Sequence, residues 1–233
     1  MKTIGILGGM SWQSTAHYYR RINEGVQARL GGLHSARILL ASVDFAEIEP
    51  LQAAGDWGGA ARRLAEHARA LEGAGADFLL LATNTMHRCA DGITDAIDIP
   101  FLHLADVTAE AIVQRAIGRV GLLGTRYTME QRFYRQRLEQ HGIAVDVPND
   151  DERAHLDRII FEELCLGVVT DESRRALQRM IHSLSDAGAQ AVIAGCTEIT
   201  MLIDQGNSPL PLFDTTAIHC DAAVECALEG IDA

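Results

Sequence analysis

The sequence predicts an α/β protein built from two similar, doubly wound lobes, each containing a parallel sheet. Three observations predict this fold. Short apolar runs alternate with longer segments of helical periodicity, the runs are continuous rather than alternating, and their order repeats in the second half of the chain. Continuous apolar runs are typical of parallel strands that are covered by helices on both faces. With 233 residues, 48% of them hydrophobic, the chain can bury one large core or two small ones.

Eight apolar runs are expected to form strands, and helices are expected between them. The predicted strands are, in chain order, TIGILG, ARILLASVDF, DFLLLAT, IPFLHL, RVGLLGT, IAVDV, AQAVIAGC and LPLFD. The predicted helices span residues 12–30, 57–72, 85–97, 105–117, 129–141, 151–166, 170–187 and 216–229. Thr170, which precedes two acidic residues, is expected to cap one helix, because acidic groups suit the positive end of a helix dipole.

An internal repeat is the strongest sign of organisation. Three segments of the first half, TIGILGG, the strand before Thr83 and IPFLHL, correspond in order to RVGLLGT, the strand before Cys196 and LPLFDT. Gly8 precedes Thr83 by 75 positions, and Gly124 precedes Cys196 by 72. We therefore expect a duplicated fold in which the last helix of each lobe crosses to the other. Residues 1–104 with 215–233 would form one lobe and residues 105–214 the second.

Composition excludes several classes of protein. The formal net charge of −12 argues against nucleic-acid binding, which depends on neutralising phosphates with Lys and Arg. The N-terminal stretch MKTIGILGG leads into a strand pattern without a signal peptide, and no window resembles a membrane span, so we expect a cytoplasmic protein without membrane contact. The five cysteines include no CxxC pair, and no His/Asp/Glu cluster has ligand spacing, so neither a disulfide framework nor a metal site is predicted.

Two similar stretches place protic side chains at strand tips. Thr83-Asn84-Thr85 and Cys196-Thr197-Glu198 each follow an apolar strand and open a helical segment. Ligands of open α/β sheets lie beyond the carboxyl ends of the strands, so two facing lobes would present both tips to a shared cleft. A thiolate at a helix N-terminus is a competent general base. Structural interpretations are also open: a buried thiol at Cys196 and an N-cap or turn residue at Thr83.

Other candidate residues lie in loops and on the helix after Thr83. Residues 8–11, Gly-Gly-Met-Ser, either hold an anion such as a carboxylate on backbone N–H groups or form only a tight turn. Neither this loop nor residues 124–126 match the GxGxxG nucleotide fingerprint. Gln52 could orient a substrate carboxylate or amide. His87 either adjusts nearby proton affinities or is an ordinary helix histidine.

Seven segments in order are similar to segments of the aspartate/glutamate racemase family: IGILGGMSW, VDFAEIE, ATNTMH, GLLGTRYTM, IIFEEL, AGCTEI and LPLFDTTAIH. The resemblance covers nearly the whole chain. It implies racemisation of L- and D-amino acids by a homodimer that uses no pyridoxal phosphate or other cofactor. In that family two cysteines, one per lobe, remove and return the α-proton on opposite faces. The implied substrate site consists of Met10, Gln52, Asn84, Thr85, Thr125, Thr197 and Glu198.

The resemblance places Cys196 at the second catalytic position, whereas Thr83 replaces the first cysteine, as in a broad-specificity racemase subgroup. We interpret Thr83 as a weakened but retained position, because a hydroxyl is a weaker acid than a thiol but can relay a proton or hold a water. Family members that favour aspartate resemble one another in having basic residues in two segments. The corresponding segments of this chain, residues 46–52 and 161–167, contain no Lys or Arg, which favours neutral or varied substrates. Arg126 is a cation that could still reach an acidic substrate.

Two alternatives remain at this point. Relatives of similar fold use a single cysteine for decarboxylation or cis–trans isomerisation of small dicarboxylates, which suits a chain with Cys196 alone. The chain could also be a turnover-deficient paralogue that binds amino acids. The Asn-Thr and Thr-Glu companions of the two strand tips favour an amino-acid substrate over a dicarboxylate.

Overall fold

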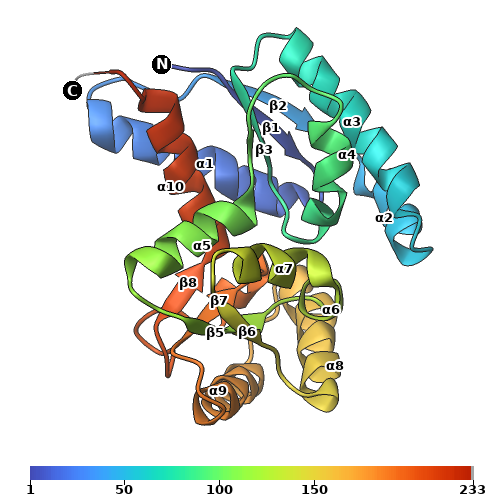
Figure 1. The fold of residues 1–233 in the computed structure, drawn as a ribbon, viewed down its shortest axis with the longest axis vertical. Helices are drawn as coiled ribbons and strands as arrows, with labels where there is room; N and C mark the ends of the chain where they lie inside the picture. The colour runs from blue at the N-terminus through green and yellow to red at the C-terminus, as the bar shows by residue number, and fades with distance from the viewer. Residues whose placement is uncertain (232–233) are drawn as a thin grey trace. The chain divides into compact units, whose positions relative to one another are not determined.

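The computed structural model describes residues 1–231 and consists of two compact units (Figure 1). The first unit comprises Met1–Leu104 with the segment that begins at His219, and the second is Ala105–Ile218. The boundary after Ile218 falls inside helix α10 (Thr215–Leu228), whereas the sequence analysis placed it after residue 214. Asp232 and Ala233, which the sequence analysis assigned to the first lobe, lie outside the described residues.

The first unit contains a parallel four-stranded sheet in the order β2-β1-β3-β4. Its strands are β1 (Ile4–Gly8), β2 (Ile38–Ser42), β3 (Phe78–Leu81) and β4 (Phe101–Leu102). Every residue of β1 and β3 is buried, as expected for central strands made of continuous apolar residues. β2 is at the edge of the sheet and is only partly covered.

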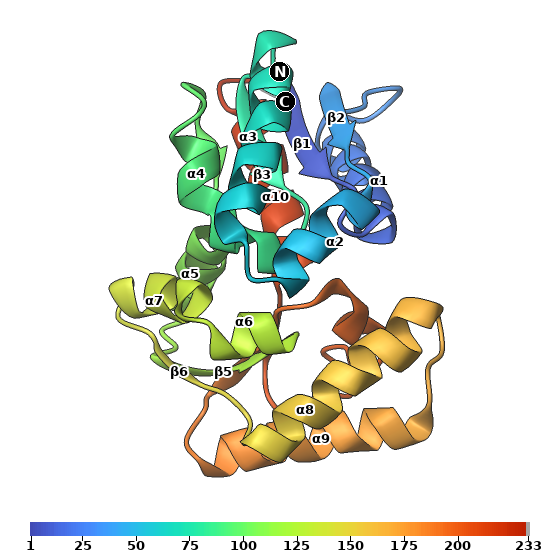
Figure 2. The ribbon, with the colours of Figure 1, turned by 90° about the vertical axis from the view of Figure 1, so that its right-hand side faces the viewer.

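Helices cover both faces of this sheet (Figures 1 and 2). On one face α1 (Trp12–Leu30) and α10 pack in a cluster that includes Ile6, Ile22 and Val224. On the other face α2 (Phe45–Ala53), α3 (Trp57–Gly73), the 3-10 helix η1 (Thr85–Cys89) and α4 (Ala90–Thr94) pack in a second cluster. Two layers of helix therefore enclose β1 and β3 and expose only the ends of the strands to ligands.

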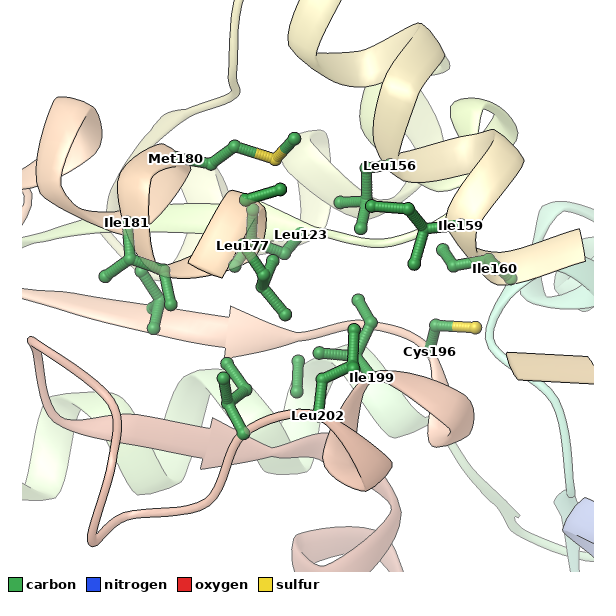
Figure 3. Packing of buried hydrophobic residues seen from close by; sticks show 14 of the residues in the cluster. Leu123, Leu156, Ile159, Ile160, Leu177, Met180, Ile181, Cys196, Ile199 and Leu202 are labelled. Atoms are coloured by element: carbon green, nitrogen blue, oxygen red, sulfur yellow. The ribbon is translucent and has the colours of Figure 1, made fainter. Parts of the chain in front are cut away.

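The second unit has the strand order β6-β5-β7-β8, again fully parallel. The strands are β5 (Arg119–Leu123), β6 (Ala144–Asp146), β7 (Ala191–Ala194) and β8 (Leu212–Asp214). The surrounding helices are α5 (Leu104–Gln114), α6 (Arg126–Glu130), α7 (Arg132–Gln140), α8 (Asp150–Arg158) and α9 (Asp171–Asp186). Side chains of α8, α9, β5 and β7 form one apolar cluster, which Figure 3 shows from close by.

Matching hydrogen bonds confirm the duplicated fold. The amide of Ala82 donates to the carbonyl of Leu7 at 2.9 Å, and in the second unit the amide of Gly195 donates to the carbonyl of Leu123 at 2.7 Å. Both bonds extend the pairing of the two central strands by one residue. They place Thr83 and Cys196 at equivalent positions, directly beyond the carboxyl end of the third strand of each unit.

Three predicted helices are interrupted in the structure. Residues 85–97 form the 3-10 helix η1 and then α4, and residues 129–141 contain a break at Gln131, whose ψ of 147° is extended. After α8 the chain continues as a π-helical turn η2 (Ile159–Glu163) and a 3-10 turn η3 (Leu164–Leu166). The predicted Thr170 cap is confirmed, since its side chain accepts from Ser173 N at 3.1 Å. None of the described helices combines the length and apolar character needed to cross a bilayer.

Candidate active site

The turn between β1 and α1 is built around two glycines. A Cβ on Gly8 would lie 2.5 Å from Oγ1 of Thr15, and Gly9 has a φ of +95° and would clash with the backbone of Val43. The close approach lets Thr15 Oγ1 accept from Gly9 N at 2.8 Å and donate to Ser11 O at 2.9 Å. The geometry of this turn therefore requires glycine at positions 8 and 9. This requirement holds whether or not the turn also binds an anion.

The backbone at Thr83, just beyond the end of β3, is fixed by hydrogen bonds of His87. Nδ1 of His87 lies 2.7 Å from the carbonyl oxygen of Thr83, and Nε2 accepts from Leu104 N at 3.2 Å. These two bonds require a neutral ring with the proton on Nδ1, because Nε2 serves as an acceptor. Burial lowers the pKa of His87 well below 6.5, and His103 and His219 lower it further. His87 therefore positions the Thr83 backbone and has no free nitrogen to deprotonate the Thr83 hydroxyl.

The histidine behind Thr83 belongs to a buried cluster within the first unit. The ring centroids of His87 and His103 are 4.7 Å apart, and those of His87 and His219 are 5.9 Å apart. His219 Nε2 lies 2.9 Å from the carbonyl of Leu102 and Nδ1 lies 3.0 Å from the hydroxyl of Tyr18, which therefore donates to it. Burial lowers the pKa of His219 to about 4. His87 and His219 are the neutral imidazoles of this cluster, and His219 joins α10 to α1 and β4.

Met10, Gln52 and Asn84 follow three neighbouring strands of the first sheet. Met10 comes after β1, Gln52 is on α2 after β2, and Asn84 comes after β3. Parallel strands end at the same edge, so Met10 and Asn84 lie at the edge where Thr83 follows β3 and Thr85 begins η1. Met10, Gln52 and Asn84 are buried, with Met10 packed in the same cluster as Ile48 of α2. Met10 thus joins the turn after β1 to α2 through an apolar contact region.

In the second unit Cys196 is paired with a carboxylate. Its thiol donates to Oε2 of Glu198 at 3.0 Å, and its side chain is 8% exposed. Burial raises the pKa of Cys196 well above its ordinary range, and the Glu198 charge and hydrogen bond raise it further. The resting group is therefore a thiol rather than the helix-stabilised thiolate that the sequence suggested. In Figure 3 the sulfur of Cys196 points away from Leu177 and Ile181, at the end of the apolar cluster.

Cys165 lies close to this pair, a feature that sequence reasoning missed. It is in η3, which packs against η4 (Thr197–Met201), the segment that follows Cys196. Cys165 is exposed, and burial together with the Glu198 charge raises its pKa to about 11. The sequence analysis did not single out Cys165, which lies 31 positions before Cys196 (196 − 165) with no motif linking the two.

The second-lobe candidate Thr125 caps α6 and follows β5 at the same edge as Cys196 and Thr197. Its Oγ1 accepts from Thr128 N at 3.4 Å. The neighbouring Arg126 does not offer a free cation, because its Nε lies 3.0 Å from Oε1 of Glu130. An acidic substrate would have to compete with Glu130 for this guanidinium.

Together the two units offer matched strand tips with different acidities. Cys196 is a thiol whose proton is already shared with a carboxylate, whereas Thr83 has a hydroxyl and a carbonyl fixed by a neutral imidazole. Proton transfer to and from carbon is the chemistry that such groups support. Residues 1–231 contain no group of three or more His, Cys, Asp or Glu side chains placed to hold a metal ion.

Comparisons with known proteins are consistent with this arrangement. The family model for Asp/Glu/Hydantoin racemases matches residues 7–223. The structure of a candidate Asp/Glu racemase from Yersinia pestis is 55% identical, with a TM-score of 0.94 over 98% of this chain and 100% of that one. An aspartate racemase homologue from Pyrococcus horikoshii OT3 is 36% identical, with a TM-score of 0.88 over 98% and 100% of the two chains. The broad specificity amino-acid racemase RacX of Bacillus subtilis (strain 168) is 24% identical over 230 residues, which are 97% of this chain and 98% of RacX.

Proposed function

Because the chain belongs to the Asp/Glu/Hydantoin racemase family, we propose that it interconverts L- and D-amino acids by proton transfer at the α-carbon without pyridoxal phosphate. Inversion requires that one group removes the α-proton from one face while a second group returns a proton to the other. A duplicated fold supplies two such groups at equivalent strand tips. We propose that Thr83 and Cys196 act on the same substrate molecule.

The observation that carries the proposal is the 3.0 Å contact between the Cys196 thiol and Glu198. Glu198 accepts the thiol proton, and the resulting thiolate removes the α-proton from one face of the substrate. In the opposite direction the Cys196 thiol donates its proton to the carbanion, and Glu198 restores the thiol. A partly buried carboxylate next to the sulfur gives the thiol a base within hydrogen-bonding reach, which a structural cysteine does not need.

Thr83 serves the other face as the weaker partner. Its hydroxyl cannot act as a strong base, so it relays a proton between the carbanion and a water molecule. His87 fixes the Thr83 carbonyl at 2.7 Å and so fixes the direction of the strand tip. Met10, Gln52, Asn84, Thr85, Thr125 and Thr197 hold the carboxylate and amino group of the substrate around the α-carbon.

The substrate set we propose is a varied group of amino acids rather than aspartate or glutamate alone. Arg126 is already paired with Glu130, and the segments 46–52 and 161–167 contain no basic residue. A side-chain carboxylate would therefore lack a free cation near these segments. The similarity to a broad specificity racemase supports the same proposal, and we propose a homodimer as the working form.

Incubation with single L- and D-amino acids in D₂O, without added cofactor, tests the function. For the wild type we expect deuterium to be incorporated at the α-carbon and the configuration to be inverted. NMR measures the incorporation and chiral chromatography measures the inversion. Cys196→Ala should abolish this exchange, whereas Cys220→Ala, which removes a buried thiol of the first unit, should retain it. Exchange at the wild-type rate in Cys196→Ala would exclude the mechanism.

The same incubation separates the alternatives. Saturable binding without exchange would identify a turnover-deficient binding protein. Release of CO₂ from a small dicarboxylate, without racemisation of any amino acid, would identify a decarboxylase. A bound aldimine absorbance in the purified protein would overturn the cofactor-free mechanism.

A further inference from the structure

Exposed apolar side chains lie in the second unit on the segments next to Cys196. They are on η2, on η3, on the two residues after Gly167 and at the end of η4: Phe161, Leu166, Val168, Val169 and Met201. η3 packs against both η2 and η4. Leu166 is the most exposed of the set, at 72%. Large apolar side chains left in water on neighbouring elements mark a binding surface, which we call the η2–η4 surface.

The η2–η4 surface adjoins the reactive thiol of the proposed mechanism. η4 begins at Thr197, directly after Cys196, and Leu164 of η3 packs with Cys196 in one buried apolar cluster. In Figure 3, Ile160 of η2 lies beside Cys196 at the end of that cluster. η3 therefore buries Leu164 against the cluster that contains the thiol and leaves Leu166 in solvent.

Hydrogen bonds hold this segment in place. Oε2 of Glu163 accepts from the hydroxyl of Ser173 on α9 at 2.6 Å. The carbonyl of Glu163 accepts from Val168 N at 2.9 Å, which closes the turn at Gly167. The exposed apolar side chains are thus presented by a fixed backbone, so a ligand that binds them orders little additional chain.

The same segments offer no cation to a negatively charged side chain. Residues 159–170 and 196–204 contain no Lys, Arg or His. The acidic residues in these two segments are Glu162, Glu163, Glu198 and Asp204. Arg174 of α9 donates to the carbonyl of Leu202 at 2.9 Å and pairs with Asp171. A substrate carboxylate here would be desolvated among acidic groups, whereas an apolar side chain would remove apolar area from water.

We propose that the η2–η4 surface binds the side chain of the substrate, and that the chain prefers amino acids with large apolar side chains, such as leucine and methionine. This inference rests on the proposed function, which places the substrate α-carbon at the Cys196 sulfur. From there the side chain extends over η3 and contacts Leu166. The contact stabilises the bound substrate and the transition state alike, so it lowers KM more than it changes kcat.

Racemisation of single amino acids by the full chain tests this preference. Leucine and methionine should exceed alanine, aspartate and lysine in kcat/KM by roughly tenfold or more, as added methylenes do in an apolar site. Leu166→Asp should raise the KM for leucine by roughly tenfold but leave that for alanine nearly unchanged, because a methyl group does not reach this side chain. Leu166→Met, which keeps an apolar side chain of similar volume, should retain the preference. Val113→Asp, an exposed change on α5, is the matched control and should leave all values unchanged.

Alanine is the internal reference that separates this inference from the proposed function. If no amino acid, alanine included, exchanges its α-proton, the racemase mechanism fails and the inference fails with it. If alanine is racemised but leucine and methionine show no advantage over alanine, aspartate or lysine, the inference is wrong and the mechanism stands. Equal losses for alanine and leucine in Leu166→Asp would also overturn the inference, since they would show that Leu166 supports the site in general and does not contact the substrate side chain.

Discussion

The thiol of Cys196 donates a hydrogen bond of 3.0 Å to the carboxylate of Glu198, two residues further along the chain. The contact has opposite effects on the resting and the working enzyme. The negative charge raises the pKa of the thiol and so keeps it protonated. In the proposed mechanism the same carboxylate accepts the thiol proton once a substrate is bound. Glu198 therefore keeps Cys196 protonated before substrate binds, and in the proposed mechanism it is also the group that deprotonates Cys196.

Removal of this carboxylate should make the thiol more acidic and the enzyme slower. In Glu198→Gln the pKa of Cys196 is expected to fall, because burial remains but the charge and the thiol–carboxylate hydrogen bond are lost. Proton exchange should nevertheless fall, on the order of 10²-fold, because the internal base is gone. The midpoint of iodoacetamide alkylation against pH, measured in a Cys165→Ser background, reports the first effect. Glu162→Gln, an exposed change on η2, should shift neither quantity, and an unmoved midpoint in Glu198→Gln would refute the coupling.

The second prediction concerns Thr83. Thr83→Cys should supply a thiol to the second face, speed the slower direction of exchange and make the two directions more nearly equal. Thr83→Ala should slow that direction further, within the ~10²- to 10⁴-fold that general acid–base catalysis contributes. Deuterium washin from the L and from the D enantiomer separately measures both directions. Identical rates in all three proteins would reduce Thr83 to a turn residue.

A third prediction separates positioning by His87 from a purely structural role. His87→Leu removes the 2.7 Å bond to the Thr83 carbonyl, so exchange on the Thr83 face should fall more than exchange on the Cys196 face. Thr200, at the equivalent place after Cys196, donates to the Thr197 carbonyl at 2.8 Å. Thr200→Val should lower exchange on the Cys196 face more than exchange on the Thr83 face. Equal losses on both faces in His87→Leu would indicate general destabilisation instead.

The strands could be predicted from the sequence, because continuous apolar runs such as residues 78–81 and 191–194 have few alternatives to a buried parallel strand. Helix α2 was missed. Pro50 lies inside it and lacks the N–H that a helix interior uses, so the segment resembled a loop. Asp44 offsets this loss by capping the helix through Ala46 N at 3.0 Å.

The site was predictable only in part. The equivalent positions of Thr83 and Cys196 were predicted from the repeat, which is a property of sequence order. The Cys165 neighbour and the His87–His219 cluster depend on contacts between distant segments, 132 positions apart in the second case, and no local pattern encodes them. The protonation of Cys196 was misjudged because a motif shows the helix that follows but not the burial and the Glu198 side chain.

The histidine cluster gives a last prediction, on stability against pH. His219 is neutral in the fold, where its pKa is about 4, and has an ordinary value of 6.5 when the chain unfolds. Between these two values the unfolded chain binds more protons, so the free energy of unfolding must fall as the pH falls. The stability contribution is complete above pH 6.5 and is lost as the pH approaches 4, a change on the order of 3 kcal/mol for His219. His87, with its pKa lowered in the same direction, adds to this acid sensitivity.

His219→Gln tests this linkage, because a glutamine amide can still donate to the Leu102 carbonyl but does not titrate. The variant should be less stable than wild type near neutral pH, since the acceptor for the Tyr18 hydroxyl is altered, yet it should lose less stability on acidification. Urea unfolding at a series of pH values between 4 and 6.5, the two pKa values of His219, gives the slope directly. His17→Gln, which removes an exposed histidine from α1, is the matched control and should keep the wild-type slope. A slope unchanged by His219→Gln would mean that other groups cause the acid sensitivity and that the His219 ring is not held neutral by its burial.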